Sequence, residues 1–357
     1  MSAPRVLVCG TVFAQGLGGV QRHNREMLPR AARLLEARGG ELAVLVGRDG
    51  LDFELPATVR RIESDVPSAP ALKRFWSESK ALRKATEHGV RYDLVHTAHL
   101  PAPRRLDVPF TLLLHDLKSV ASPFVSLARK IGGRAVIRDA IRRAGHVFFV
   151  SQALASEWRA ISGRDLAHAS VLHNGSDHLS LVRRAPASPS FLLFVGRIEP
   201  RKDVETLLRA LALAADMPPV LLAGAEQGQH GKRLRAIVAE LHLEERVRFI
   251  GPQSDESLAQ LYSTCAAVVL PSLREGFDLP LVEALRAGAP VIASDLAVHR
   301  ELAADHARYF TPCNPRRLVD AYRALGGNGS VPPALPSWDD AAAQLVDRWC
   351  ALHAARR

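Results

Sequence analysis

The feature that most constrains the fold is a repeated alternation of short apolar runs with helical patterns. Several runs are apolar at consecutive positions, as expected for strands that are buried on both faces of a sheet. In the first half the runs are RVLVCG, ELAVLVG, YDLVHTA, FTLLLHD, HVFFVSQ and ASVLHNG, and in the second half they are FLLFVGR, PVLLAG, VRFIG, AAVVLPS, PVIAS and ARYF. Helical patterns such as VETLLRALALAAD lie between them. Each half is therefore predicted to be an open, mostly parallel, doubly wound α/β sheet.

Two breaks in this alternation predict the domain boundaries. The Pro- and Ser-rich segment RRAPASPS separates the two series of strands, and the Gly/Pro-rich segment GGNGSVPPALP precedes a last helical stretch that Ser337 could cap. The length of 357 residues also suggests two domains. We predict an N-terminal Rossmann-like domain over 1–182, a linker over 183–190, a second Rossmann-like domain over 191–330 and a C-terminal helix over 331–357.

The charge of the chain is uneven, with a formal net value of +10. Residues 1–180 hold 26 Lys and Arg against 17 Asp and Glu. Nucleic acid, anionic lipid or a phosphorylated substrate would each explain this excess. Aromatic content is only 6%, and no stacking motif interleaves with the basic residues, so we expect no nucleic-acid partner.

Cysteine usage and hydropathy predict the compartment. The four cysteines are scattered without metal-ligand spacing, which favours reduced thiols. There is no apolar run long enough for a membrane-spanning helix, and the N-terminus lacks the apolar core of a signal peptide. We expect a cytoplasmic protein.

The first candidate binding segment is QGLGGVQRHNREML, which follows the first predicted strand. Gly16, Gly18 and Gly19 precede a helical stretch, where glycines allow close backbone approach and free N–H groups attract anions. A flexible turn is the alternative interpretation. Gln21 stands where a dinucleotide fingerprint needs its third glycine, which argues against an NAD-dependent oxidoreductase, and the Gly-Lys-Ser/Thr of a Walker loop is absent.

Cations and a histidine follow two other strands. In FVGRIEPRKDVETLL, Arg197 leaves a strand end and Lys202 lies near a helix start, a pattern that suits a diphosphate site or, equally, a solvated basic turn. In LLLHDLKS, His115 also follows a strand. A lone histidine is more often structural, but the carboxyl end of a strand favours a functional role.

The segment REGFDLPLVEALRAGAP places two carboxylates around a helix start. Glu275 lies on a loop after a strand, Pro280 suits the first helical turn, Glu283 falls one turn inside, and Gly288 suits the helix end. A carboxylate accepts two hydrogen bonds from a vicinal diol and repels a bare phosphate. We therefore expect these glutamates to bind sugar or ribose hydroxyls.

With these residues in place, the chain resembles the retaining GT-B glycosyltransferases, specifically glycosyltransferase family 4, the glycosyl transferases group 1. The resemblance covers most of the chain and rests on the order and spacing of its motifs: the Gly-rich loop, HD, VSQAL, VLHNGSD, FVGRIEPRKDVETLLRAL, VRFIGPQSDESLAQLYSTCAAVVLPS, the pair Glu275 and Glu283, and SW before the last helix. It implies two Rossmann-like domains that face an interdomain cleft, with a C-terminal helix crossing back to the first domain. Asp278 departs from the common E-G-F-G pattern, which has glycine at this position.

The resemblance also implies roles for individual residues in a nucleotide-sugar donor site. Arg197 and Lys202 would bind the diphosphate, Glu283 the ribose and Glu275 the donor sugar, with His115 beside that sugar. Of these, His115, Glu275, Arg197 and Lys202 are the predicted catalytic residues. The other implied donor-binding residues are Gly18, Gly19, Asn174, Ile250, Gly276, Phe277, Asp278 and Leu279.

The implied activity is retaining transfer of a hexose, mannose or similar, from a GDP- or UDP-linked donor to a glycan or lipid-linked acceptor in bacterial polysaccharide or glycoconjugate assembly. No Asp-x-Asp metal motif occurs, so we expect neither a metal nor another cofactor, with fixed positive charge stabilising the leaving diphosphate. The alternative is a sugar-nucleotide-binding GT-B protein without transferase activity. An epimerase or a phosphorylase would bring motifs that are absent here.

Residues 124–145 form a basic and apolar stretch in the first half. Arg134, Arg138 and Arg142 recur every four residues and are expected to share a helix face. One interpretation is peripheral contact with an anionic membrane at its inner face. The other is an ordinary amphipathic helix with a solvated basic face.

Overall fold

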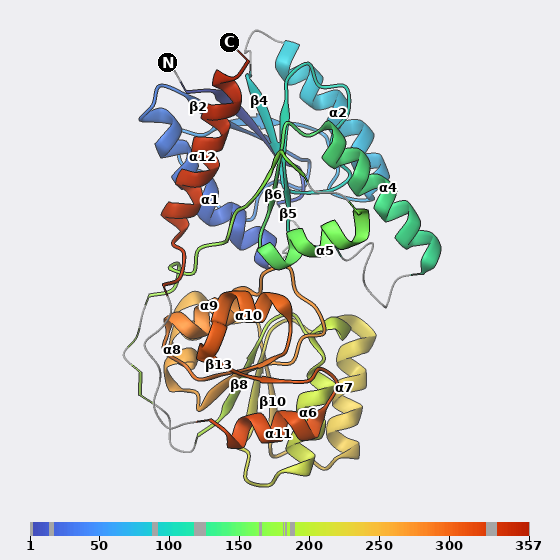
Figure 1. Cartoon of the computed structure of the whole chain (residues 1–357), viewed down its shortest axis with the longest axis vertical. Helices are drawn as coiled ribbons and strands as arrows, with labels where there is room; N and C mark the ends of the chain where they lie inside the picture. The colour runs from blue at the N-terminus through green and yellow to red at the C-terminus, as the bar shows by residue number, and fades with distance from the viewer. Residues whose placement is uncertain are drawn as a thin grey trace. The chain divides into compact units, whose positions relative to one another are not determined.

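The computed structural model describes residues 3–13, 18–87, 92–117, 126–163, 166–180, 182, 184–185, 190–325 and 334–356. The chain divides into two units, one made of Met1–Gly175 with Pro336–Arg357 and the other of Ser176–Leu335 (Figure 1). The sequence analysis placed the first break later, at residue 182. The difference arises because Ser176 and His178 contact the second unit: Ser176 Oγ accepts a hydrogen bond from Arg286, and His178 Nε2 lies 3.1 Å from Glu283 Oε1.

In the described residues, the sheet of the first unit has seven parallel strands in the order β3-β2-β1-β4-β5-β6-β7. The strands are β1 Arg5–Gly10, β2 Glu41–Val46, β3 Arg60–Glu63, β4 Leu94–Thr97, β5 Phe110–Leu114, β6 His146–Phe149 and β7 Ala169–Val171. Six of them coincide with predicted apolar runs. The sequence analysis missed β3, because this edge strand reads RRIE and has no buried residue.

Helices cover both faces of this sheet (Figure 1). The helices α1 Gly19–Glu36 and α12 Trp338–Ala354 lie on one face, and α2 Ala71–Glu87, α4 Leu127–Arg143 and α5 Gln152–Ser162 on the other. Ser337 caps α12 in a capping box with Asp340, as the sequence predicted. The ion pairs Arg30–Asp339 and Arg38–Asp347 join α12 to α1, so the C-terminal helix packs on the first unit as expected.

The sheet of the second unit has six parallel strands in the described residues, in the order β10-β9-β8-β11-β12-β13. The strands are β8 Leu192–Val195, β9 Val220–Ala223, β10 Val247–Gly251, β11 Ala267–Leu270, β12 Val291–Ser294 and β13 Ala307–Phe310, all of them at predicted runs. On one face lie α6 Val204–Leu213, α7 Gly228–Glu240 and α11 Pro315–Arg323, and on the other α8 Asp255–Thr264, α9 Leu279–Arg286 and α10 Ala297–Ala303 (Figure 1). The described residues of this unit also form the 3-10 helices η1 Pro200–Lys202 and η2 Ala304–His306. Both units are therefore doubly wound Rossmann-like sheets, as predicted.

None of the helices in the described ranges is long and apolar enough to cross a membrane.

The turn before α12 leaves no room for a side chain at Gly175. A Cβ at this position would lie 2.2 Å from the backbone nitrogen of Trp338, whereas a Cβ at Gly132, in the exposed part of α4, would meet nothing within 4 Å. We predict that Gly175→Ala lowers the free energy of unfolding by about 1–3 kcal/mol through overpacking. Gly132→Ala should stabilise the helix slightly, by up to about 1 kcal/mol. Thermal unfolding of both variants tests this, and equal melting temperatures would contradict it.

Candidate functional site

The candidate site of the second unit lies where its strand order reverses. The chain runs outward from β8 to β9 and β10, and then returns to β11 on the other side of β8. In such sheets, ligands bind outside the carboxyl ends of the two strands at the reversal. The segment after β8 carries Arg197 and Lys202, and the segment after β11 carries Glu275 and Asp278. Pairing of β8 with β11 explains why residues so distant in sequence meet.

Lys202 is the centre of this cluster. It is 5% exposed, and its Nζ lies 2.8 Å from Glu275 Oε1 and 3.0 Å from Asp278 Oδ1. Its side chain passes over Gly196, where an added Cβ would lie 3.3 Å from Lys202 Cε. Burial disfavours the charged amine, but Asp278 and Glu275 outweigh burial and raise the pKa of Lys202. Lys202 is therefore a fixed cation.

Arg201 binds Glu275 from the other side. Its Nη1 donates to Glu275 Oε2 and to the carbonyl of Arg274, and its Nε pairs with Glu199. Ser272 Oγ donates to Glu275 Oε1 at 2.8 Å. Burial opposes the charge of Arg201, yet Glu275 and Glu199 raise its pKa above the ordinary value. Each oxygen of Glu275 thus faces at least one charged donor.

Asp278 bridges Lys202 to His299. Its Oδ2 lies 3.0 Å from His299 Nε2, and His299 Nδ1 lies 2.8 Å from the carbonyl of Ser294. Burial would raise the pKa of Asp278, but Lys202 and His299 together hold it well below the usual range. Burial would lower the pKa of His299, and the hydrogen bond and charge of Asp278 raise it instead. Asp278 has a φ of 80°, a left-handed conformation that favours glycine, which explains why glycine is common at this position of the pattern.

Glu283 lies on α9, which begins at Leu279 with Pro280 in its first turn, as predicted. Glu283 as a whole is 7% exposed. Tyr262 donates its hydroxyl to Glu283 Oε2 at 2.7 Å, and His178 Nε2 lies near Oε1. Glu283 therefore lies one turn inside α9, and it is not one of the carboxylates that contact Lys202 directly.

The other predicted residues of the second unit lie at the same edge of the sheet. Arg197 is exposed just after β8, and Ile250 is half-buried near the end of β10. The loop residues Gly276, Phe277 and Leu279 are buried. Their roles in donor binding stay predictions.

The predicted residues of the first unit form a separate group. His115 follows β5, and its ring packs edge-on against His23 at a centroid distance of 5.0 Å. His23 Nδ1 lies 2.7 Å from Asn174 Oδ1. The Nε2 of His115 is buried and has no hydrogen-bond partner among the described residues. Burial, followed by the neighbouring His23 and His96, lowers the pKa of His115 well below its ordinary value, so the imidazole is neutral.

The glycine loop is only partly described. Gly18 has a φ of 58° and is the N-cap residue of α1, and both Gly18 and Gly19 are exposed. Gly16 lies outside the described residues. An exposed left-handed glycine at a helix start is compatible with close approach of an anionic ligand.

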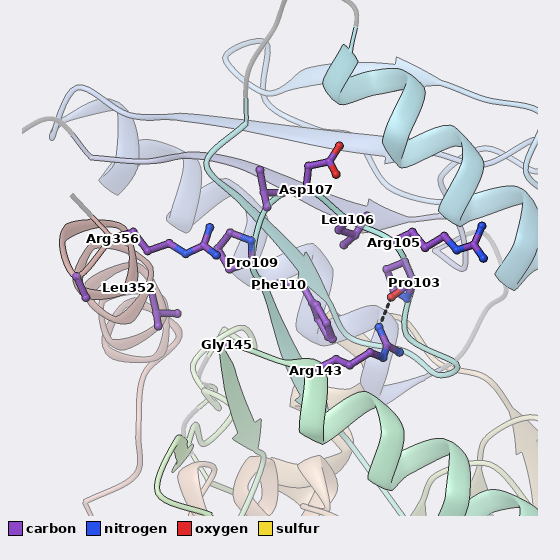
Figure 2. Close-up of a pocket in the computed structure, with 12 residues that line it drawn as sticks. Pro103, Arg105, Leu106, Asp107, Pro109, Phe110, Arg143, Gly145, Leu352 and Arg356 are labelled. Atoms are coloured by element: carbon purple, nitrogen blue, oxygen red, sulfur yellow. Dashed lines mark hydrogen bonds between the residues drawn. The ribbon is translucent and has the colours of Figure 1, made fainter.

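One cavity of the first unit lies away from all of these residues. It has a volume of about 490 Å³ and lies where β5 and β6 begin, beside the end of α12 (Figure 2). Arg143 lines it and donates to the carbonyl of Pro103, and its guanidinium lies 5.4 Å from the centre of the Phe110 ring. The cavity contains none of the predicted site residues. In the part of the chain that the structure describes, no group of three side chains has the arrangement of a metal site.

Several contact residues were not predicted. Arg201, Tyr262, His178 and His299 all touch predicted site residues. For Arg201, adjacency to Lys202 after a strand was a usable signal. Tyr262 and His299 lie on α8 and α10, and His178 lies on a turn after β7; their contacts depend on tertiary packing, and no local pattern marks them.

The geometry defines a protein with two Rossmann-like domains, each with polar side chains at the carboxyl edge of a parallel sheet. The family model described as glycosyl transferases group 1 matches residues 182–329, and the model described as glycosyltransferase family 4 matches residues 17–178. The chain belongs to this glycosyltransferase family and has its GT-B architecture. It is a glycosyltransferase that transfers sugar in glycoconjugate biosynthesis.

Two curated relatives show the range of the family. The O-antigen chain mannosyltransferase RfbU of Salmonella typhimurium is 25% identical over 290 residues, which are 79% of this chain and 80% of the relative. A D-inositol 3-phosphate glycosyltransferase of Mycolicibacterium vanbaalenii is 32% identical over 247 residues, and the match spans 59% of this chain and about half of the relative, 54%.

Solved structures share the fold. Sucrose-phosphate synthase from Thermosynechococcus elongatus has a TM-score of 0.79 at 21% identity and matches 99% of this chain and 100% of its own. HepE from Anabaena, in complex with UDP-glucose, has a TM-score of 0.65 at 19% identity, over 99% of this chain and 98% of its own.

The buried contacts of Asp278 generate a pH-dependent prediction. Because its pKa is depressed, Asp278 contributes stability above its ordinary pKa of 3.8 and loses that contribution as the pH falls toward the lower folded value. We predict that Asp278→Asn lowers the free energy of unfolding by about 2–3 kcal/mol at pH 7, because it removes a charged partner of the buried Lys202 amine. The deficit should shrink as the pH falls below 3.8.

The matched control is Asp295→Asn. Asp295 pairs with Arg300, but both side chains are about half exposed, so its loss should cost less than about 1 kcal/mol. Urea unfolding of the two variants and the parent at several pH values gives the comparison. Equal losses of unfolding free energy in the two variants would contradict the prediction, because the Lys202 cluster would then stabilise the protein no more than a surface ion pair does.

Proposed function

We propose that the chain is a retaining, metal-independent hexosyltransferase that moves mannose or a similar hexose from a GDP- or UDP-linked donor to a glycan or lipid-linked acceptor. The observation that carries this proposal is the buried cation Lys202 at the strand reversal of the second unit. A lysine ammonium has three N–H donors, and the two carboxylates use two of them. The third donor is suited to an oxygen of a diphosphate.

The carboxylates of Glu275 and Glu283 are proposed to bind hydroxyl groups of the donor rather than its diphosphate. Glu275 is fixed by Arg201 and Lys202, and its net charge is compensated there, so it can accept hydroxyls of the donor sugar without repelling the diphosphate. Glu283, held by Tyr262, is proposed to accept the ribose hydroxyls. The remaining donor contacts are proposed to come from Arg197, Gly18, Gly19, Asn174, Ile250 and the loop Gly276 to Leu279.

The leaving group determines the electrostatics of the reaction. Cleavage of the bond from sugar to phosphate leaves negative charge on the diphosphate and oxocarbenium character on the sugar. Lys202 and Arg197 are proposed to stabilise that negative charge without a metal, and the absence of an Asp-x-Asp motif supports the same proposal. Because Glu275 and Asp278 fix Lys202 before the donor binds, little reorganisation of this cation is needed in the transition state.

Retention of the anomeric configuration is proposed to follow a front-face route. The acceptor hydroxyl attacks from the side of the leaving phosphate, which takes the proton of that hydroxyl. His115 then serves to orient the donor sugar. Its neutral imidazole and its unpartnered Nε2 support a hydrogen bond to a sugar hydroxyl rather than a charge interaction.

Both choices of nucleotide have support from relatives. RfbU is named as a mannosyltransferase, and HepE, which has the same fold, was solved with UDP-glucose. A panel of GDP- and UDP-sugars is therefore the first experiment. Nucleotide-dependent thermal shifts identify the donor base, since a ligand that binds the native state raises its apparent stability. NMR of the product gives the anomeric configuration, and chelator treatment tests metal independence.

Lys202→Ala is the sharpest test of the donor site. We predict that it lowers kcat/KM for the donor by 100-fold or more, about 3 kcal/mol in the transition state. Lys232→Ala is the matched control, because Lys232 is exposed on α7 in the same unit and should change kcat/KM less than twofold. Turnover of Lys202→Ala close to that of the parent would remove Lys202 from the donor site.

We further propose that the first unit contacts anionic membranes through α4. Leu127 and Ile131 are 74% and 61% exposed, and Arg134, Arg138 and Arg142 are exposed on the same helix. The helix α2 lies on the same face of the sheet as α4 (Figure 1) and carries two more large exposed apolar residues, Leu72 and Trp76. Of the stretch named in the sequence analysis, Phe124 and Val125 lie outside the described residues. Apolar side chains beside arginines suit an anionic membrane surface.

Co-sedimentation with vesicles tests the membrane proposal. We predict binding to vesicles that contain phosphatidylglycerol, weaker binding to pure phosphatidylcholine, and loss at high salt. Leu127→Glu should weaken the binding at least fivefold, whereas Leu213→Glu, at an exposed leucine of the second unit, should not. Binding that does not depend on anionic lipid would contradict the proposal.

A further inference from the structure

The first unit has its own strand reversal, and a buried polar cluster lies there. Its chain runs from β1 outward to β2 and β3 and then returns to β4 on the other side of β1. The carboxyl ends of β1 and β4 are therefore the place where a sheet of this kind binds a ligand. Thr11 follows β1, and Thr97 and His99 lie at the end of β4. None of these residues has a role in the donor site.

Glu78 of α2 joins these strand ends. Its side chain is fully buried, its Oε1 accepts a hydrogen bond from Thr11 Oγ1 at 2.6 Å, and its two oxygens lie 3.0 Å and 3.1 Å from His99 Nε2. Burial would raise the pKa of Glu78, but the contact with His99, the hydrogen bond of Thr11 and the charge of Arg74 lower it. The carboxylate is therefore ionised and accepts hydrogen bonds only.

This carboxylate fixes how the imidazole of His99 is oriented. Because both oxygens of Glu78 are acceptors, Nε2 must carry a proton. In the neutral ring, Nδ1 then has the lone pair, and its partner among the described residues is Thr97 Oγ1 at 3.5 Å, the outer limit of a hydrogen bond. An acid that holds one ring nitrogen while the other contacts a substrate hydroxyl is the arrangement seen in catalytic triads.

The side chains of His99 and Glu78 differ in their exposure to solvent. The side chain of His99 is 8% exposed, whereas that of Glu78 is 0% exposed. A ligand that reaches this cluster therefore meets His99 before Glu78, which is covered. The buried negative charge of Glu78 next to His99 disfavours an anionic ligand and favours neutral hydroxyls.

We propose that His99 binds a hydroxyl of the sugar acceptor at the strand reversal of the first unit, and that Glu78 is the positioning residue that holds His99. The inference rests on the proposed function and adds the class of the acceptor group, a neutral polyhydroxyl ring. His99 accepts a hydrogen bond from that hydroxyl and does not take its proton. Thr11 supports the arrangement by occupying one lone pair of Glu78.

The experiment compares His99→Gln, Glu78→Gln and a control in the full chain. Methyl glycosides and myo-inositol serve as neutral acceptor probes, and inositol phosphate serves as an anionic probe. Their binding is measured directly by saturation-transfer NMR, and their KM is measured separately from that of the sugar nucleotide. His168→Gln is the control, because His168 lies at the opposite end of the sheet, where its Nε2 contacts the carbonyl of Ile141.

We expect both site variants to raise the KM and the dissociation constant of a neutral probe at least tenfold, while the KM of the donor changes less than twofold. Glu78→Asp, which keeps the charge, should recover part of the affinity, a result that a merely structural role of Glu78 would not give. The control should match the parent. Parallel rises of donor and acceptor KM would show general damage and overturn the inference, as would unchanged probe affinity, a preference for the anionic probe, or no binding of any neutral probe by the parent.

The two proposals fail differently. If the parent binds a neutral probe through His99 but transfers no sugar from any nucleotide donor, the proposed function fails and the binding site remains. If it transfers sugar and the His99 and Glu78 variants do so with parental acceptor KM, only the acceptor assignment fails.

Discussion

The candidate donor site depends on one constraint, the burial of the Lys202 ammonium. An isolated charge is costly to bury, and it persists only when opposite charges and hydrogen bonds surround it. Glu275 and Asp278 supply those charges, Arg201 and Ser272 position Glu275, and His299 positions Asp278. The fold makes this possible because β8 and β11 are neighbours, so the segments that follow them meet at one edge of the sheet. The result is a fixed positive charge next to oriented carboxylates, before any ligand arrives.

The same topological rule organises the first unit with different chemistry. There the reversal between β1 and β4 brings together a carboxylate, an imidazole and hydroxyls, and no lysine contacts them in the described residues. A buried lysine with a third N–H donor suits a diphosphate oxygen, and a carboxylate that is held by an imidazole and a hydroxyl suits neutral alcohols. In the proposed function, one architecture used twice would provide two complementary kinds of site, one for a charged donor and one for a hydroxylated acceptor.

The sequence predicted most of the fold because buried parallel strands are continuous apolar runs. Every strand of the second unit and all but β3 of the first coincide with such a run, and β3 escaped because its residues are charged and lie at an edge. The division of the chain into two units after Gly175 differs by a short segment from the predicted boundary at 182, because Ser176 and His178 contact Arg286 and Glu283. The start of α9 and the cap of α12 followed correctly from Pro280 and Ser337, since both signals are local.

The candidate site was less predictable than the fold. Lys202 and Glu275 could be selected because each follows a strand, but their direct contact could not, because it depends on which strands pair. Asp278 was named as a departure from the pattern and as an implied donor-binding residue, and the structure makes it the link between Lys202 and His299. Glu78 and His99 gave no signal, since a glutamate inside a helix and a histidine after a strand are common. Only their juxtaposition at the strand reversal distinguishes them.

The most direct test of the central claim is a crystal structure of the protein soaked with GDP-mannose or UDP-glucose. The account predicts diphosphate oxygens within hydrogen-bond distance of Lys202 Nζ, the ribose at Glu283 and the hexose at Glu275. A donor bound elsewhere on the second unit, with Lys202 still contacted only by Glu275 and Asp278, would contradict it.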